Sequence, residues 1–174
     1  MLMKSYSVHF RFSQHFDFPA EEAYKWCTDY DSGDIGLAGE RGIRAVRRIN
    51  EDTLVLTDTY FTDKGKVARK KIIRLYPETH SWTNTRISTE GRFSQFLYQI
   101  IPEAEGSRLE FTGSQVIPGK TPPAPKLAAL ARKYVKEDSQ TWQNLARAME
   151  EDLGGRSKPK KQRRKFPSRP QRRN

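Results

Sequence analysis

The feature that most constrains the fold of this chain is a long segment that contains neither glycine nor proline. It follows a proline-rich connector, Gly119 to Pro125, and continues to Leu153. At 3.6 residues per turn, such a segment forms about seven or eight helical turns. Apolar residues recur in this segment at helical spacing and form a stripe, which Asp138 interrupts. A helix with an apolar stripe must bury that stripe against another element. The stripe consists of Leu127, Leu130, Tyr134, Trp142, Leu145 and Met149.

The segments before this helix predict an antiparallel sheet. Between Tyr6 and Phe18, apolar and polar residues alternate almost without interruption, which indicates a long strand with one buried face. A short helix through Trp26 and Cys27 follows, and then an irregular loop or short helical turn rich in glycine and aspartate. Turn residues separate the next six strand-like segments. These lie near Ile43 to Ile49, Thr53 to Phe61, Lys66 to Tyr76, Ser81 to Ser88, Phe93 to Ile101 and Ser107 to Ile117.

One hairpin of this sheet allows its register to be predicted. If Lys64 and Gly65 form a two-residue turn, apolar residues face apolar residues across the two strands, and an acid faces a base. The predicted pairs are Leu54 with Leu75, Leu56 with Ile73, Asp58 with Lys71, and Tyr60 with Arg69.

Charge divides the chain into two parts. The formal net charge is +11, but residues 156 to 174 carry ten Lys or Arg and no acid. Residues 1 to 155 therefore hold 22 basic and 21 acidic residues and are nearly neutral. We expect a folded domain over residues 1–153 and a disordered tail over 154–174, because the tail has too few apolar residues to build a core.

The basic tail predicts electrostatic contact with a polyanion. Such a segment could attract RNA, DNA or an anionic membrane, and each phosphate contact would steepen the salt dependence. A solubilising extension without a specific partner is the alternative. The residues that we expect to make the contact are Lys160, Lys161, Arg163, Arg164 and Lys165.

The order of elements is a strand, one or two short helices, about six strands and a long terminal helix. This α+β order, β-α-α-β6-α, resembles the START-related lipid-transfer and polyketide-cyclase superfamily, SRPBCC, over roughly residues 5 to 153. The residues that carry the likeness are the end of the first strand, Phe16-Asp17-Phe18-Pro19-Ala20-Glu21-Glu22, then Tyr24, Trp26, Tyr98-Gln99-Ile100-Ile101-Pro102 and Glu105-Gly106-Ser107-Arg108-Leu109, and the terminal helix.

The resemblance implies the helix-grip fold, a curved antiparallel sheet of about seven strands wrapped around the long C-terminal helix. It also implies an elongated apolar cavity for a lipid, sterol, polyketide or similar molecule, but no catalytic residue that can be carried over. We expect Arg69 to be the one cation of the cavity, and treat Lys71, Arg86 and Arg108 as solvated. The expected cavity residues are Phe10, Phe12, Leu56, Tyr60, Arg69, Ile73, Phe111, Tyr134 and Trp142.

Two carboxylates are candidates for acid–base catalysis. Asp58 shares the parity of apolar strand residues, and Asp138 lies on the helix stripe. A carboxyl group in a dry pocket has a raised pKa and can exchange protons near neutral pH. The alternative is structural: Asp58 pairs with Lys70 or Lys71, and Asp138 lies at the edge of the stripe.

We expect no cofactor and no metal. A calcium loop starting at Asp29 lacks a ligand at its fifth position and the required glycine at its sixth. The glycines between Gly33 and Gly39 do not match a phosphate loop and indicate a flexible cavity lip instead. The single cysteine, Cys27, is expected to be a buried, inert thiol, and one cysteine is typical of a reducing compartment.

These observations favour a protein that binds or transports a small hydrophobic ligand. One alternative is an enzyme of the cyclase, aromatase or hydrolase type that uses cavity carboxylates, although an enzyme is the less favoured hypothesis. Another is a nucleic-acid-associated protein that acts through its basic tail. With no secretory h-region and no apolar run of about 18 residues, we expect a cytoplasmic protein without a transmembrane segment. The identity of the ligand and the oligomeric state stay open.

Overall fold

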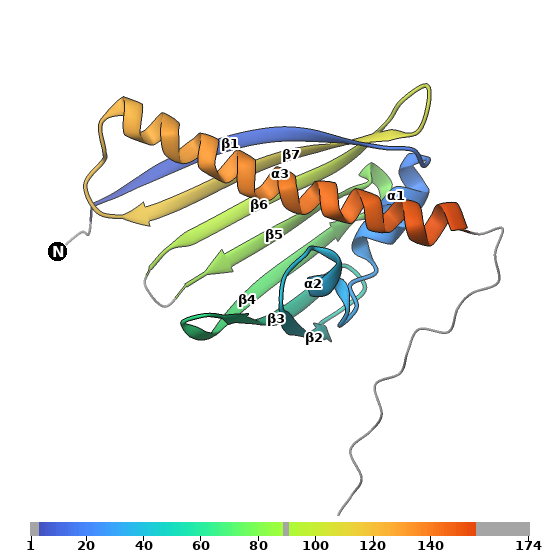
Figure 1. Cartoon of the computed structure of the whole chain (residues 1–174), viewed down its shortest axis with the longest axis horizontal. Coiled ribbons are helices and arrows are strands. Elements are labelled where there is room, and N and C mark those ends of the chain that lie inside the picture. The colour runs from blue at the N-terminus through green and yellow to red at the C-terminus, as the bar shows by residue number, and fades with distance from the viewer. Residues whose placement is uncertain (1–3, 89–90, 156–174) are drawn as a thin grey trace, which may run out of the picture.

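A seven-stranded antiparallel sheet and a long helix across one of its faces form the described part of the chain, residues 4–88 and 91–155 of the computed structural model (Figure 1). The strands lie in the order β1-β7-β6-β5-β4-β3-β2. The elements are β1 (Ser5–Phe16), α1 (Ala20–Thr28), α2 (Asp34–Leu37), β2 (Gly42–Arg48), β3 (Thr53–Thr62), β4 (Gly65–Tyr76), a 3-10 turn (Pro77–Thr79), β5 (Ser81–Ile87), β6 (Phe93–Pro102), β7 (Ser107–Pro118) and α3 (Ala124–Gly154).

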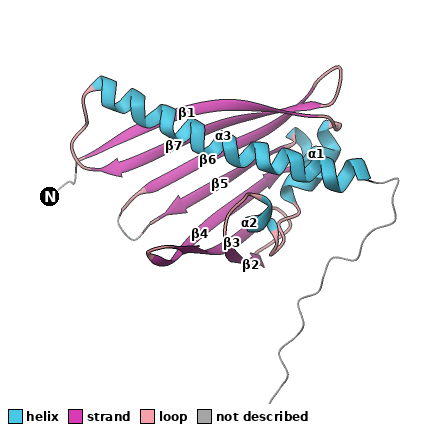
Figure 2. Ribbon diagram, in the orientation of Figure 1, coloured by secondary structure: helices cyan, strands magenta, loops and turns pink. Residues whose placement is uncertain are grey.

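The predicted α+β helix-grip architecture and its order of elements are confirmed. β2 to β7 form a meander, and β1 pairs with β7, so β1 and β2 are the edge strands of the sheet. Helix α3 begins at Ala124, earlier than expected, because Pro125 is tolerated in a first turn, where its missing amide hydrogen has no helical acceptor. All three helices lie on the same side of the sheet (Figure 2).

The predicted register of the β3–β4 hairpin is wrong by two residues. Thr62 pairs with Gly65, so the turn consists of Asp63 and Lys64, and the ladder places Asp58 opposite Arg69. Gly65 has a φ of 114°, which side-chain-bearing residues rarely adopt, and Thr62 donates its hydroxyl hydrogen to the Gly65 carbonyl at 2.8 Å. Because a shift of two residues preserves parity, the predicted faces of both strands are still right.

The core lies where α3 crosses the sheet. Trp142 and Met149 are the largest buried residues of the helix. Trp142 contacts Trp82 of β5 at 6.2 Å between ring centroids, and Trp82 stacks on Tyr98 of β6 at 4.8 Å. Farther towards the start of the helix, Tyr134 packs on Phe10 of β1 at 5.3 Å. The apolar stripe of α3 thus faces the inner side of the sheet, as its periodicity predicts, with Trp142 and Met149 buried and its other residues partly buried.

Helix α2 and the loop around it close one side of this arrangement. Asn144 of α3 donates a hydrogen bond to the carbonyl of Ala38 at 3.2 Å, which holds the loop against the helix. Gly42 is the first residue of β2, and a Cβ atom on it would lie 2.4 Å from the Thr59 carbonyl oxygen of β3. Only glycine therefore allows the start of β2 to lie this close to β3. The glycine-rich segment therefore lies between α3 and β2.

The expected basic tail lies almost wholly outside the described residues. The expected boundary at residue 153 precedes the end of α3 at Gly154 by one residue. The expected polyanion contacts, Lys160, Lys161, Arg163, Arg164 and Lys165, fall in the part that the structure does not describe. No helix in residues 4–88 and 91–155 is long and apolar enough to span a bilayer.

Candidate functional site

A cavity of about 220 Å³ lies between the inner face of the sheet, helix α3 and the α2 loop. Its walls combine many aromatic side chains with a cluster of charged ones. The aromatic residues that line it are Trp26, Tyr30, Tyr60, Trp82, Phe96, Tyr98, Phe111 and Trp142. All three tryptophans of the chain are among them.

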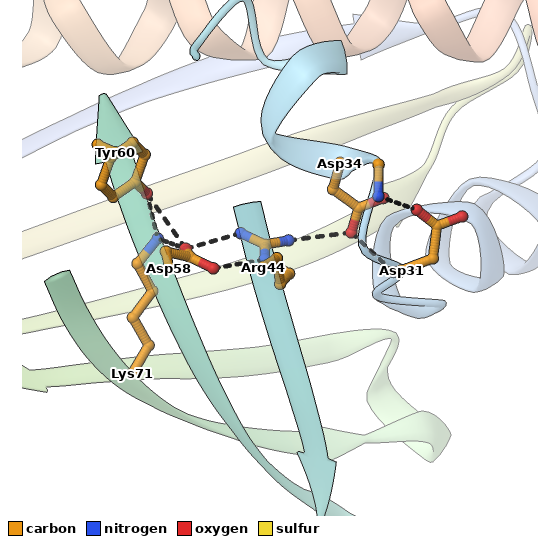
Figure 3. Close-up of polar contacts among 7 residues, drawn as sticks. Asp31, Asp34, Arg44, Asp58, Tyr60 and Lys71 are labelled. Carbon is orange, nitrogen blue, oxygen red and sulfur yellow. Dashed lines mark hydrogen bonds and ion pairs between the residues drawn. The ribbon is translucent and has the colours of Figure 1, made fainter. Parts of the chain in front are cut away.

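Asp58 is the centre of the charged wall, and its side chain is completely buried (Figure 3). Arg44 of β2 donates two hydrogen bonds to it, from Nε at 2.7 Å and from Nη2 at 2.9 Å. Lys71 of β4 lies 2.6 Å from Oδ2, and Tyr60 donates its hydroxyl hydrogen to the same oxygen at 3.1 Å. Burial alone would raise the pKa of Asp58, but Arg44 and Lys71 lower it to about 2.

Arg44 also links the sheet to the α2 loop. Its Nη1 atom lies 3.0 Å from Oδ2 of Asp34, and that oxygen also accepts the backbone N–H of Asp31 at 3.0 Å (Figure 3). Burial raises the pKa of Asp34 to about 6, although Arg44 opposes the shift. One guanidinium thus joins a carboxylate of the sheet to a carboxylate of the loop.

Four charged residues of the cavity lie outside this network: Glu40 and Arg69, which are exposed, and Arg86 and Asp138, which are partly buried. Arg86 projects from β5 with its guanidinium carbon 4.6 Å from the centroid of Phe96, and its buried Nε atom has no hydrogen-bond partner among the described residues. Burial lowers the pKa of Arg86 and raises that of Asp138, on α3, to about 6, while Arg86 and Lys71 oppose the latter shift. Neither residue forms an ion pair within 4.0 Å in the part of the chain that the structure describes.

The structure places only some of the expected cavity residues at the cavity. Leu56, Tyr60, Arg69, Phe111 and Trp142 line it, with Arg69 exposed at its rim and 5.0 Å from the Tyr60 ring centroid.

Four others belong to the solid core instead, which corrects the expectation. Phe12 stacks on Phe111 at 4.5 Å, and Phe10 fills the space between Phe111 and Tyr134. Ile73 points inward from β4 and is fully buried in the core. Aromatic side chains therefore fill the end of the fold near β1, and the cavity lies towards β2 to β5.

The expectation that Lys71 and Arg86 are solvated is wrong. Lys71 shares its parity with Ile73, and Arg86 shares its parity with Trp82, so both point inward with these buried neighbours. The parity in the sequence indicates this inward direction for both residues, and here it outweighs the general preference of charged side chains for solvent. Arg108 does lie on the outer face, where it pairs with Glu103 and Glu110.

The two candidate catalytic carboxylates differ sharply. Asp58 forms a structural ion pair with Lys71, which was the alternative prediction, and Arg44 is a second partner that the sequence did not indicate. The low pKa of Asp58 does not suit proton exchange near neutral pH. Lys70 points to the other face. Asp138 lines the cavity and keeps a pKa suited to such exchange. Cys27 also lines the cavity and is partly buried, and burial raises the pKa of its thiol.

No group of three or more His, Cys, Asp or Glu side chains is arranged to hold a metal ion within residues 4–88 and 91–155. In the segment of the rejected calcium loop, the Asp34 carboxylate instead accepts the backbone N–H of Asp31 and pairs with Arg44.

No protein-family model matches the chain, and no curated protein matches it in sequence. Solved structures do match it in fold. Ara h 8.0201 superposes with a TM-score of 0.67 at 15% identity, over 83% of this chain and 98% of that protein. The di-domain aromatase/cyclase StfQ of the steffimycin biosynthetic pathway also gives 0.67, at 13% identity over 86% of this chain, which spans about half (52%) of StfQ.

Norcoclaurine synthase from Thalictrum flavum, in complex with dopamine and hydroxybenzaldehyde, gives a TM-score of 0.60 at 10% identity over 91% of both chains. At such low identity these similarities establish the helix-grip fold, and the resemblance that predicted this fold is confirmed at that level.

Proposed function

We propose that this helix-grip protein binds a small aromatic molecule that carries an anionic group such as a carboxylate. The observation that carries the proposal is Arg86, whose Nε–H is buried against the cavity without a partner among the described residues. A buried donor without an acceptor costs about 1–3 kcal/mol, so a ligand that supplies the acceptor recovers that free energy. A carboxylate fits a guanidinium because two parallel hydrogen bonds can form.

The size of the cavity favours a ligand of one or two rings. An apolar cavity of about 150 Å³ holds benzene, whereas pockets for drug-sized ligands occupy about 300–1,000 Å³. At about 220 Å³, the cavity of this protein lies between the two. Its volume therefore supports a small aromatic compound over a sterol or a two-chain lipid.

The aromatic walls supply the remaining binding free energy. Trp82 and Phe96 line the cavity from the sheet and Trp142 lines it from α3, and burial of apolar ligand surface contributes about 25 cal/mol per Å². Aromatic rings also pair favourably with other rings in offset or edge-to-face geometry. A flat apolar body with one anionic group satisfies both parts of the site.

The proposal is tested by calorimetric titration with 2-naphthoate and with 2-naphthamide, which share a ring system and differ in charge. We expect the carboxylate to bind more tightly, and Arg86→Met to lower its affinity about 10- to 150-fold, the range for a hydrogen bond to a charged group. Arg11→Met is the matched control, because Arg11 is exposed on the outer face of β1. Binding should also shift the indole N–H signals of the cavity tryptophans. Equal affinity for the two compounds, or unchanged indole signals, would contradict the proposal.

A second candidate function rests on Asp138. A carboxyl group with a pKa of about 6, in a cavity that also holds a guanidinium, has the properties of a general base beside an oxyanion-stabilising group. Structural neighbours described as an aromatase/cyclase and a synthase are compatible with catalysis in this fold. The predicted activity is removal of a proton next to a carbonyl group.

This second function is tested by deuterium exchange at C1 and C3 of 2-tetralone in D2O, followed by NMR. We expect the wild-type protein to accelerate exchange above pH 6, where Asp138 is ionised, and Asp138→Asn to abolish the acceleration. An acceleration that survives in Asp138→Asn would assign the chemistry to another group. If the protein binds a ligand but does not accelerate exchange, the catalytic function is refuted and only the binding function stands.

A further inference from the structure

The outer face of the sheet, opposite to the helices, carries a segregated positive charge. On β2, β3 and β4 the inward residues include Arg44, Asp58 and Lys71, so the alternate residues point outward. The exposed outward cations of these strands are Arg47, Lys66, Lys70 and Arg74. We call this surface the outer basic face.

None of the outward residues of β2 to β6 is acidic. The sheet's outward acid, Glu110 on β7, is paired with Arg108 at 2.8 Å. Within residues 4–88 and 91–155, Lys70 and Arg74 form no ion pair. The near neutrality of the folded domain therefore averages over an outer sheet face that has no acid from β2 to β6 and acids that lie elsewhere.

Aliphatic side chains lie among these cations. Ile72, next to both Lys70 and Arg74 along β4, is 49% exposed, and Leu97 of β6 is 46% exposed. Register places Arg74 opposite Thr83, and Thr83 opposite Leu97, so Arg74 and Leu97 belong to one row across the sheet. The described helices cover none of this surface (Figure 2). Apolar side chains in the middle of a basic, acid-free face suit a partner that is both anionic and apolar.

We propose that the outer basic face binds the surface of an anionic lipid bilayer. Lys and Arg near such a surface are attracted by the negative potential, and aliphatic side chains enter the boundary between headgroups and acyl chains. Single-stranded nucleic acid fits less well because its bases need aromatic platforms. The exposed outward aromatics of β3 and β4, Phe61 and Tyr76, lie near opposite ends of this hairpin, and Lys66 lies 5.7 Å from the Phe61 ring centroid.

The test measures binding of the full chain to vesicles of phosphatidylcholine with 30% phosphatidylserine, by sedimentation at low and at physiological salt. We expect binding that weakens with salt and is absent on pure phosphatidylcholine. Each basic residue near the surface contributes about fivefold, so Lys70→Gln with Arg74→Gln should lower the partition coefficient about 25-fold. Because every variant keeps residues 156–174, the difference between variants isolates the folded surface.

Matched variants decide between the outer basic face and net charge alone. Arg132→Gln with Lys136→Gln removes the same charge from exposed positions on α3, and we expect it to change the partition coefficient less than twofold. Equal losses in the two double variants would overturn the proposal.

A third variant distinguishes lipid from nucleic acid. Ile72→Thr with Leu97→Thr keeps strand-forming residues and should weaken vesicle binding severalfold, without affecting a gel shift with oligouridylate. If this variant binds vesicles like the wild type, while Lys70→Gln with Arg74→Gln loses oligouridylate binding, the surface is a nucleic-acid surface and the membrane proposal is wrong.

Discussion

Replacement of Asp58 by asparagine tests whether the charged wall of the cavity stabilises the fold. The side chain is fully buried and interacts with Arg44, Tyr60 and Lys71. Asparagine has nearly the same shape and can keep one acceptor oxygen, so the change removes the negative charge with little loss of volume. Lys71 then loses its counter-ion, and Arg44 keeps only Asp34.

Two routes give the size of the expected effect. Removing one partner of a buried ion pair typically costs about 3–5 kcal/mol. Independently, a shift of the Asp58 pKa from 3.8 to about 2 corresponds to about 2 kcal/mol of stability. The pKa of Lys71 is already lowered to about 8 by burial, and without Asp58 it falls further, so Lys71 can lose its proton and limit the cost. We therefore expect about 3 kcal/mol at pH 7, at the lower end of the first range.

The assay is urea unfolding of both proteins between pH 7 and pH 2. Because the pKa of Asp58 is lower in the folded state, its contribution is complete above its unfolded value near 4 and is lost as the pH falls through 2. The difference in unfolding free energy between wild type and Asp58→Asn should therefore not shrink between pH 7 and pH 5, where renewed protonation of Lys71 in the variant increases it, and should shrink below pH 4.

The control is Asp63→Asn, in the exposed β3–β4 turn, which we expect to change stability by less than about 0.5 kcal/mol. A loss below about 1 kcal/mol for Asp58→Asn at pH 7, or a difference that does not change between pH 5 and pH 2, would refute the assigned role of the network.

Two further predictions concern the cavity and the core. The affinity for 2-naphthoate should rise as the pH falls through about 6, because Asp138 loses its repulsive charge. Calorimetry of Asp138→Asn should show that most of this pH dependence is removed. An unchanged pH profile in the variant would assign the pH dependence to another group, such as Asp34. Gly113→Ala should lower the unfolding free energy by about 1–3 kcal/mol, because a Cβ there would lie 2.5 Å from Cζ of Phe10. Gly36→Ala, which meets no atom within 4 Å, is its control in the same thermal melts, and equal melting temperatures for the two variants would contradict the packing argument.

Much of the fold was predictable because the relevant signals are local. The alternation from Tyr6 onward and the helical stripe through Trp142 each report one buried face, whatever lies against it. The hairpin register was not predictable from cross-strand chemistry alone. It depends on the conformation of Gly65, and a two-residue shift leaves every side chain on its predicted face.

The site was less predictable than the fold. Asp58 and Asp138 looked alike in the sequence, as carboxylates on apolar faces. Their pKa values diverge because Asp58 meets Arg44 and Lys71 from neighbouring strands, whereas Asp138 is buried beside more distant cations. Nothing in the sequence near Arg44 distinguishes it from the other arginines of β2 as the partner of Asp58.

The sequence by itself determined the order of elements, the face that each strand and helix buries, and the separation of a nearly neutral domain from a basic segment after residue 155. Tertiary structure alone decided which charges meet, where aromatic side chains fill the space and where they leave a cavity. The physical reason is that periodicity and propensity act over a few neighbouring residues, whereas ion pairs and cavities depend on register and packing between segments far apart in the chain.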